Sequence, residues 1–199
     1  MTRSYRLAKR AEAQEETREK IVRATMALHD EKGVATTSFS DVAERAGVGA
    51  ATVYRHFPTL NALVAACGAH VWEEMRPPRP EDAAAVFAGL PSRRARLERL
   101  VQELDAFYAR GAGRLWAASQ DRDRIPELDQ FLRGVEAGVA ALAEAALGPD
   151  AAPQTVKVAA ALSDFTVWRA LNRGGTAPAD LAGLQVAILE AAIAATERG

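Results

Sequence analysis

An all-α fold is what the 199-residue sequence predicts. Apolar residues recur at helical spacing nearly everywhere, as in Ile21, Ala24 and Leu28, and no segment alternates convincingly as a strand would. About half of the residues (49%) are apolar, so a chain of this length can bury a sizeable core. Glycine- and proline-rich breaks separate the helical stretches at Gly33, 47–49, Pro58, 76–80, 89–91, 148–153 and 174–178.

Charge and cysteine content narrow the classes of protein. The chain has 25 Lys and Arg against 26 Asp and Glu, so it lacks a uniformly basic coat and any contact with nucleic acid must be local. Its only cysteine, Cys67, cannot form an internal disulfide, and no Cys/His cluster has metal-ligand spacing. We therefore expect a cytoplasmic protein without a metal or other cofactor. The N-terminus lacks an apolar signal region, and no window approaches the ~18 apolar residues of a membrane span, so neither export nor membrane insertion is expected.

The first 13 residues carry a concentration of positive charge. Arg3, Arg6, Lys9 and Arg10 all lie within the first ten residues. Residues 1–13 are predicted to be a flexible basic arm, which could follow DNA phosphates or could be a solvated tail with no task.

Residues that cap or end helices predict three helices within residues 14–60. The first helix is predicted over 14–32, with Gly33 as its terminating residue. The second begins at Ser38, whose hydroxyl can form a capping box with Asp41. Residues 47–49 form a glycine turn, and the third helix ends before Pro58. A connecting helix over 59–75 leads to the larger remainder, residues 76–199.

Two short helices joined by a three-residue turn fit a helix-turn-helix, although any helical hairpin can have this spacing. The segment SFSDVAERAGVGAATVYRHFPTLNALVAA, residues 38–66, resembles the DNA-binding domain of the TetR family of bacterial transcriptional regulators. The similarity extends over about residues 14–70. Positions that match the family pattern are Ala43, Ala46, Gly47, Val48, Thr52, Val53, Tyr54, His56, Phe57, Thr59 and Leu63.

The resemblance implies separate tasks for the residues of the motif. Tyr54 and His56 match positions that hydrogen-bond phosphates, and Thr37 often does the same; such contacts fix register without reading sequence. Arg55 could pair with guanine, whereas an alanine can contact only a thymine methyl, so part of the specificity is expected from DNA shape. The expected base contacts are Ser40, Ala50, Ala51, Thr52 and Arg55.

Three positions depart from the family pattern. Gly49 stands where a Ser or Thr usually caps the third helix, at a cost of only a few tenths of a kcal/mol. Leu60 replaces a lysine that often binds phosphate, so the basic N-terminus gains importance. His29 takes a core position of the first helix that usually holds an aromatic residue such as Phe.

For residues 76–199 the resemblance implies a variable helical domain for ligand binding and dimerisation. The last two long helices, 153–173 and 179–198, would pair with those of a second subunit in a four-helix bundle. Packing within the subunit's own core is the alternative for their apolar stripes. The expected interface residues are Leu162, Phe165, Leu184 and Ile188. The expected ligand pocket, from aromatic residues and a nearby acid, comprises Phe107, Tyr108, Trp116, Phe131, Asp164 and Trp168.

These features together predict a homodimeric repressor of transcription that a small molecule releases from a palindromic DNA operator. One alternative is an architectural DNA-binding protein that needs no ligand. A helical enzyme is the other, but Cys67 and His70 lie one turn apart with no orienting third group. Glu73 and Glu74 are adjacent and point to different sides of a helix, so we expect no catalytic site.

Overall fold

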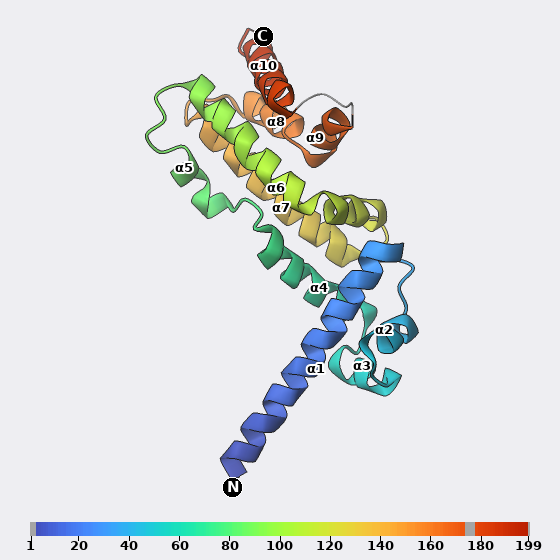
Figure 1. Cartoon of the computed structure of the whole chain (residues 1–199). Helices are drawn as coiled ribbons and strands as arrows, with labels where there is room; N and C mark the ends of the chain where they lie inside the picture. The colour runs from blue at the N-terminus through green and yellow to red at the C-terminus, as the bar shows by residue number, and fades with distance from the viewer. Residues whose placement is uncertain (1–2, 174–177, 199) are drawn as a thin grey trace. The chain divides into compact units, whose positions relative to one another are not determined.

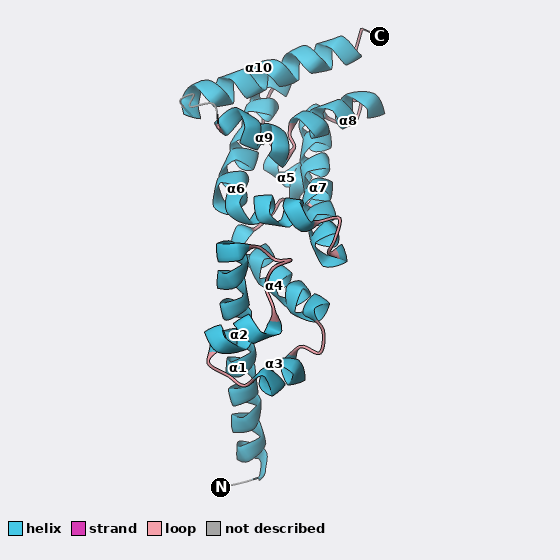
Figure 2. Cartoon of the chain, turned by 90° about the vertical axis from the view of Figure 1, so that its right-hand side faces the viewer, coloured by secondary structure: helices cyan, strands magenta, loops and turns pink. Residues whose placement is uncertain are grey.

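The computed structural model describes residues 3–173 and 178–198, and within these ranges the chain forms helices, turns and loops without any strand (Figures 1 and 2). The predicted all-α fold is confirmed. None of the described helices is long and apolar enough to span a bilayer. In order, the helices are α1 (Arg3–Lys32), α2 (Phe39–Ala46), α3 (Ala50–His56), α4 (Leu60–Met75), the 3-10 helix η1 (Pro80–Asp82), α5 (Ala83–Val86), α6 (Arg93–Asp121), α7 (Pro126–Leu147), α8 (Pro153–Leu162), α9 (Phe165–Asn172) and α10 (Pro178–Thr196).

The chain divides into two compact units, and the first of them is discontinuous in sequence. This first unit combines Met1–Glu74 with Trp116–Phe131, and the second combines Met75–Leu115 with Leu132–Gly199. The sequence alone predicts a single domain over 76–199. The end of α6 and the start of α7 instead belong to the first unit.

The basic N-terminus differs from the expectation of a flexible arm, because α1 is helical from Arg3 onward. Residues 3–13 contain Ala, Leu, Arg, Lys and Glu without Gly or Pro, and such residues favour extension of an existing helix. Arg6, Lys9 and Arg10 are exposed, as are the side chains of Tyr5 and Leu7. Residues 1 and 2 lie outside the described part of the chain.

One buried cluster holds the first unit together. Ile21 of α1, Val42 of α2, Val53 of α3 and Leu63 of α4 are each fully buried within it. Each residue lies on the inner face of its helix, as the helical spacing predicts. Burial of large apolar side chains of this kind contributes about 1.5–3 kcal/mol apiece, so these contacts fix the angle between the short helices.

Capping interactions set the ends of α2 as predicted. The Ser38 hydroxyl accepts from the Asp41 amide (3.2 Å), and the Asp41 carboxylate accepts from the Ser38 amide (2.9 Å). Gly47 ends the helix in the left-handed region (φ 61°) and its amide donates to the carbonyls of Ala43 and Glu44. Glycine enters this region without strain, and this allows the chain to turn directly into α3.

The second unit is built on α6 and α7 together with the last three helices. Arg96 of α6 donates through Nε to the Ala146 carbonyl of α7 (2.7 Å). Helix α10 packs along α8, where the Thr196 hydroxyl donates to that of Thr155 (3.0 Å) (Figure 1). The single helix predicted over 153–173 is broken after Ser163, because the Asp164 carboxylate caps a new helix, α9, by accepting from the Thr166 amide (2.8 Å).

Candidate nucleic-acid interface

Helix α3 has one face in the core of the first unit and one face in solvent. Val53 and Phe57 are buried, whereas Tyr54 and Arg55 are exposed. Because consecutive helical residues are separated by about 100°, the buried Val53 necessarily turns its sequence neighbours outward. The exposed face is therefore free to meet a partner, as a recognition helix requires.

The side chain of Tyr54 is largely exposed, and its ring packs against a residue of α2. Its side chain is 53% exposed, and its ring contacts the Phe39 ring at a centroid distance of 4.6 Å. No described residue hydrogen-bonds the phenolic oxygen. The ring is thus held in place while its hydroxyl remains available to a phosphate.

The polar and apolar residues predicted to read bases lie on the exposed face of α3 and at the start of α2. Arg55 Nη2 is 3.4 Å from the Thr52 hydroxyl, a long contact that leaves most guanidinium donors free of described partners. Ala50 and Ala51 are exposed and offer only methyl groups. Ser40 is exposed in the first turn of α2, and His56 is half-buried in the last turn of α3.

Thr37 differs from its predicted role as a phosphate donor. The side chain is only 3% exposed, and its hydroxyl donates to the Gly33 carbonyl (2.9 Å). A hydroxyl has one proton to donate, so this bond would have to break before Thr37 could serve a phosphate. The structure therefore gives Thr37 a role in holding the loop between α1 and α2.

Two cations of α1 lie beside the helix-turn-helix and were missed by the sequence reasoning. Lys20 Nζ is 3.8 Å from the point where a Cβ on Gly47 would stand. The Arg18 guanidinium lies over the Phe57 ring at 5.2 Å from the centroid. Their position could have been inferred from their spacing along α1, because both residues precede the buried Ile21 by less than one helical turn.

Other charged residues of the first unit are used in joining α1 to α2. Arg45 makes a bidentate pair with Glu31 (2.8 and 2.6 Å), and Lys32 Nζ is 2.7 Å from Asp41. Hydrogen bonds from Lys32 and Ser38 hold the pKa of Asp41 well below its usual range. These pairs orient the α2–α3 motif on α1, and their cations are already engaged.

His29 lies near the C-terminal end of α1, where the sequence expected it in a core position. Its Nε2 is buried and has no hydrogen-bond partner among the described residues. Burial lowers the pKa of His29 to about 4, although Asp30 and Asp121 act in the opposite direction. Asp121, from the end of α6, accepts from the Ala35 amide (3.1 Å) and so closes the loop that follows α1.

The six residues predicted to form a ligand pocket do not gather in one place. Tyr108 and Trp168 lie together, with ring centroids 5.5 Å apart, and both line a small cavity. Phe107 packs on Tyr108 but is not part of that lining, and Asp164 lines a different depression, beside α7. Trp116 and Phe131 belong to the first unit, where the Phe131 ring contacts that of Trp72.

The four residues expected at a dimer interface also separate. Leu184 is 46% exposed, as an interface residue of an isolated subunit should be. Phe165 is buried against Tyr108 and Trp168 within its own subunit, which leaves little of its ring for a second subunit. Leu162 and Ile188 are half-buried and line the same cavity as Tyr108.

Neither member of the Cys67–His70 pair is arranged for nucleophilic catalysis. The Cys67 thiol is buried and burial raises its pKa to about 12, so the reactive thiolate is suppressed. His70 Nε2 instead faces the Glu74 carboxylate at 3.2 Å on the exposed side of α4. Within the described ranges, no group of three or more His, Cys, Asp and Glu residues could hold a metal ion.

Comparisons with known proteins place the motif in a family. Residues 21–67 match the profile described as bacterial regulatory proteins, tetR family. The HTH-type transcriptional repressor KstR of Mycolicibacterium smegmatis is 39% identical over 85 residues, a match that spans 42% of this chain and 40% of the relative. The chain thus aligns with less than half the length of this curated relative.

Two solved structures share the fold over most of the chain. The multidrug-binding protein EbrR, complexed with imidazole, is 22% identical with a TM-score of 0.63 and 89% of each chain covered. NalD of Pseudomonas aeruginosa, described as the secondary repressor of the MexAB-OprM multidrug efflux pump, is 19% identical with a TM-score of 0.62. That alignment covers 90% of this chain and 97% of NalD. At these identities the similarity establishes the fold.

Proposed function

We propose that this chain, whose residues 21–67 match the tetR-family profile, is a homodimeric transcriptional repressor that binds an operator in double-stranded DNA. Release of the operator by a small molecule is part of the proposal. The observation that carries it is the α2–α3 helix-turn-helix, whose second helix turns Tyr54, Arg55 and two alanines outward from a capped and ion-paired scaffold. Such a helix can enter the major groove, which is about 12 Å wide.

Within this proposal some residues bind the phosphate backbone and others recognise bases. Tyr54 and His56 bind phosphates and set the register of α3. Arg55 reads a guanine, and Ala50 and Ala51 contact thymine methyls. The exposed cations at the start of α1 add a phosphate contact that depends on salt. The operator is accordingly read through few direct polar contacts, and DNA shape supplies the remainder.

A binding selection on genomic DNA fragments, followed by footprinting, tests the proposal. We expect a protected near-palindrome, because two α3 helices related by a two-fold axis enter successive major grooves. Absence of protection on every selected fragment would contradict DNA binding altogether.

Substitutions in α3 should distinguish phosphate binding from base recognition. Tyr54→Phe removes the phosphate donor but keeps the ring on Phe39, so affinity should fall roughly three- to tenfold on all sequences alike. Arg55→Ala should instead change the preferred base at one position, with ~1–3 kcal/mol of discrimination lost. Gel-shift titration against an operator library measures both.

Arg99→Ala is the matched control for the loss of an arginine, because Arg99 is exposed on α6 and pairs with Glu103 (2.6 Å). It should leave operator affinity and base preference unchanged. A uniform loss of affinity in Arg55→Ala would make Arg55 a phosphate contact and overturn its assignment as a base reader.

The exposed face of α10 supports the dimer. Leu184→Arg places a charge where the proposed interface would bury an apolar side chain, so the dimer dissociation constant should rise roughly tenfold or more. Sedimentation of the full chain at micromolar concentration measures this. Leu7→Arg, at a leucine of α1 that is also exposed, should not change association. A wild-type chain that sediments as a monomer would refute the dimer.

A further inference from the structure

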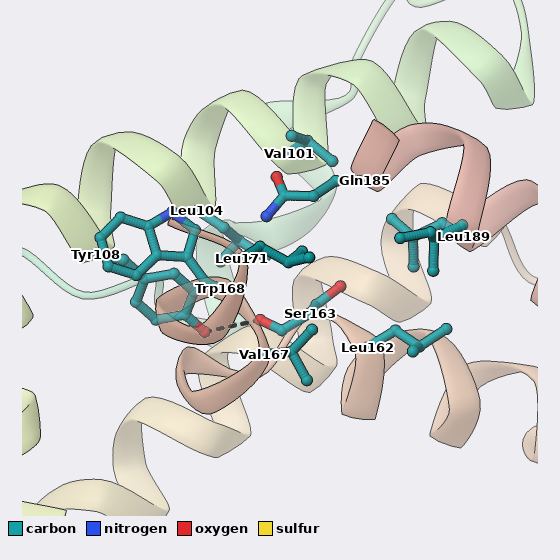
Figure 3. A pocket seen from close by; sticks show the side chains of 11 residues that line it. Val101, Leu104, Tyr108, Leu162, Ser163, Val167, Trp168, Leu171, Gln185 and Leu189 are labelled. Atoms are coloured by element: carbon teal, nitrogen blue, oxygen red, sulfur yellow. Dashed lines mark hydrogen bonds between the residues drawn. The ribbon is translucent and has the colours of Figure 1, made fainter. Parts of the chain in front are cut away.

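A small cavity of about 30 Å³ lies in the second unit, between α6 and the last three helices (Figure 3). Its walls are mainly aliphatic and aromatic, and include Leu104, Leu171 and Leu189 with the rings of Tyr108 and Trp168. None of its lining residues is charged. A space of this size has room for water only, so an organic molecule must widen it.

Ser163 brings an unsatisfied polar atom to this cavity. The residue is 8% exposed, and its Oγ is buried without a hydrogen-bond partner among the described residues. Its backbone is fully engaged, because the amide donates to the Ala159 carbonyl (3.0 Å) and the carbonyl accepts from the Tyr108 hydroxyl (2.8 Å). The bond from Tyr108 is drawn in Figure 3. A buried hydroxyl that lacks a partner is a cost that a ligand can recover.

Gln185 of α10 is the second polar residue of the lining, and no described residue hydrogen-bonds its side-chain amide. Apolar walls with two available hydrogen-bonding groups are the usual composition of a small-molecule site. We propose that this cavity binds an uncharged, mostly apolar molecule whose one polar group pairs with Ser163 Oγ and the Gln185 amide. A charged ligand is excluded, because no lining residue could compensate a buried charge.

To admit such a molecule, Trp168 or α10 must move away from α6. The Trp168 indole is half-buried, and its Nε1 donates to the Asp105 carboxylate (2.8 Å). Two ion pairs start from α6: Arg94 pairs with Glu190 of α10 (3.0 Å) and Arg93 with Glu197, the residue after α10 (2.8 Å), and both pairs are solvent-exposed. Exposed ion pairs add little stability, so the cost of moving α10 comes mainly from its buried apolar residues, such as Leu189 and Ile193, and the apolar surface of the ligand must offset that cost.

The inference rests on the proposed function in that the molecule bound here would be the effector. Its test uses the full chain without DNA and a pair of fluorescent probes. N-phenyl-1-naphthylamine is uncharged and has one N–H donor, and 8-anilino-1-naphthalenesulfonate is the same skeleton with a sulfonate added. We expect saturable binding of the neutral probe, one per chain, and at least roughly tenfold weaker binding of the sulfonate.

Two variants locate the binding. Ser163→Ala should weaken binding of the neutral probe roughly three- to tenfold, because the acceptor for its N–H is removed. Ser119→Ala is the matched control, since that hydroxyl donates to the Trp116 carbonyl (2.7 Å) in the first unit, and it should bind as the wild type does. Ile188→Phe fills the cavity and should abolish saturable binding, with helicity checked by circular dichroism.

The proposal is overturned by absence of saturable binding, by equal affinity for the two probes, or by wild-type affinity in Ser163→Ala. If Ile188→Phe fails to fold, the two serine variants still decide. Footprinting is carried out without a probe, so operator protection together with any of these results refutes the cavity assignment and leaves DNA binding intact.

Discussion

The stability of this chain should fall as the pH is lowered from about 6.5 to about 4, and His29→Phe should remove that dependence. In the unfolded chain His29 binds a proton below about pH 6.5, whereas burial lowers its pKa in the folded chain to about 4. Between these values the unfolded state holds more protons, so acid favours unfolding. The loss is complete below the folded pKa and is at most about 3 kcal/mol.

Urea titrations at pH 7, 5.5 and 4.5 measure the effect. His29→Phe should also be more stable than the wild type at pH 7, because an apolar ring replaces the buried Nε2 that has no described partner. His29→Gln, which cannot titrate, should lose the pH dependence without that gain. A wild-type slope in both variants would assign the dependence to another group. The Lys32–Asp41 pair acts in a lower range, because a carboxylate with a lowered pKa loses its contribution only below about pH 4.

Gly138→Ala should destabilise the second unit by about 3 kcal/mol. A Cβ on Gly138 of α7 would stand 1.9 Å from the Pro78 carbonyl oxygen and 2.8 Å from its carbon. These are backbone atoms, so the chain segment that follows α4 would have to move away from α7. Thermal or urea unfolding of the full chain measures the loss.

Gly111→Ala is the informative comparison within the same unit. Its Cβ would stand 2.0 Å from Met75 Cε, the end of a flexible side chain that can change rotamer. We expect a loss of about 1 kcal/mol, because the thioether moves at a smaller cost than a backbone. Equal losses in the two variants would show that the approach of Pro78 to α7 is not what fixes their packing.

Features that depend on local chemistry could be predicted from the sequence. The Ser38–Asp41 capping box and the turn at Gly47 each follow from residues within a few positions of one another, and both are found in the structure. The end of the single helix expected over 153–173 also had a local signal, since Asp164 lies two residues before Thr166 as an N-cap requires. That signal was outweighed by the long run of helix-favouring residues around it.

Features that depend on tertiary packing could not be predicted. Tyr108 and Trp168 were expected in a pocket because they are aromatic, but nothing in the sequence indicates that Ser163 Oγ would be left without a partner. The exposed face of α3 follows from helical spacing, whereas the burial of Thr37 depends on how the loop after Gly33 folds back on α1. The N-terminus is a different case, because the helix propensity of residues 3–13 already favoured a helix over a flexible arm.

The discontinuity of the first unit limits how its helix-turn-helix can be exchanged between proteins. A fragment that stops at Glu74 would lack Trp116–Phe131. Within that missing segment lie the carboxylate of Asp121, which accepts from the Ala35 amide, and the ring of Phe131, which packs edge-on against Trp72. A graft of the first unit onto another protein would therefore need two pieces of chain, so recombination at a single crossover near residue 75 is structurally disfavoured.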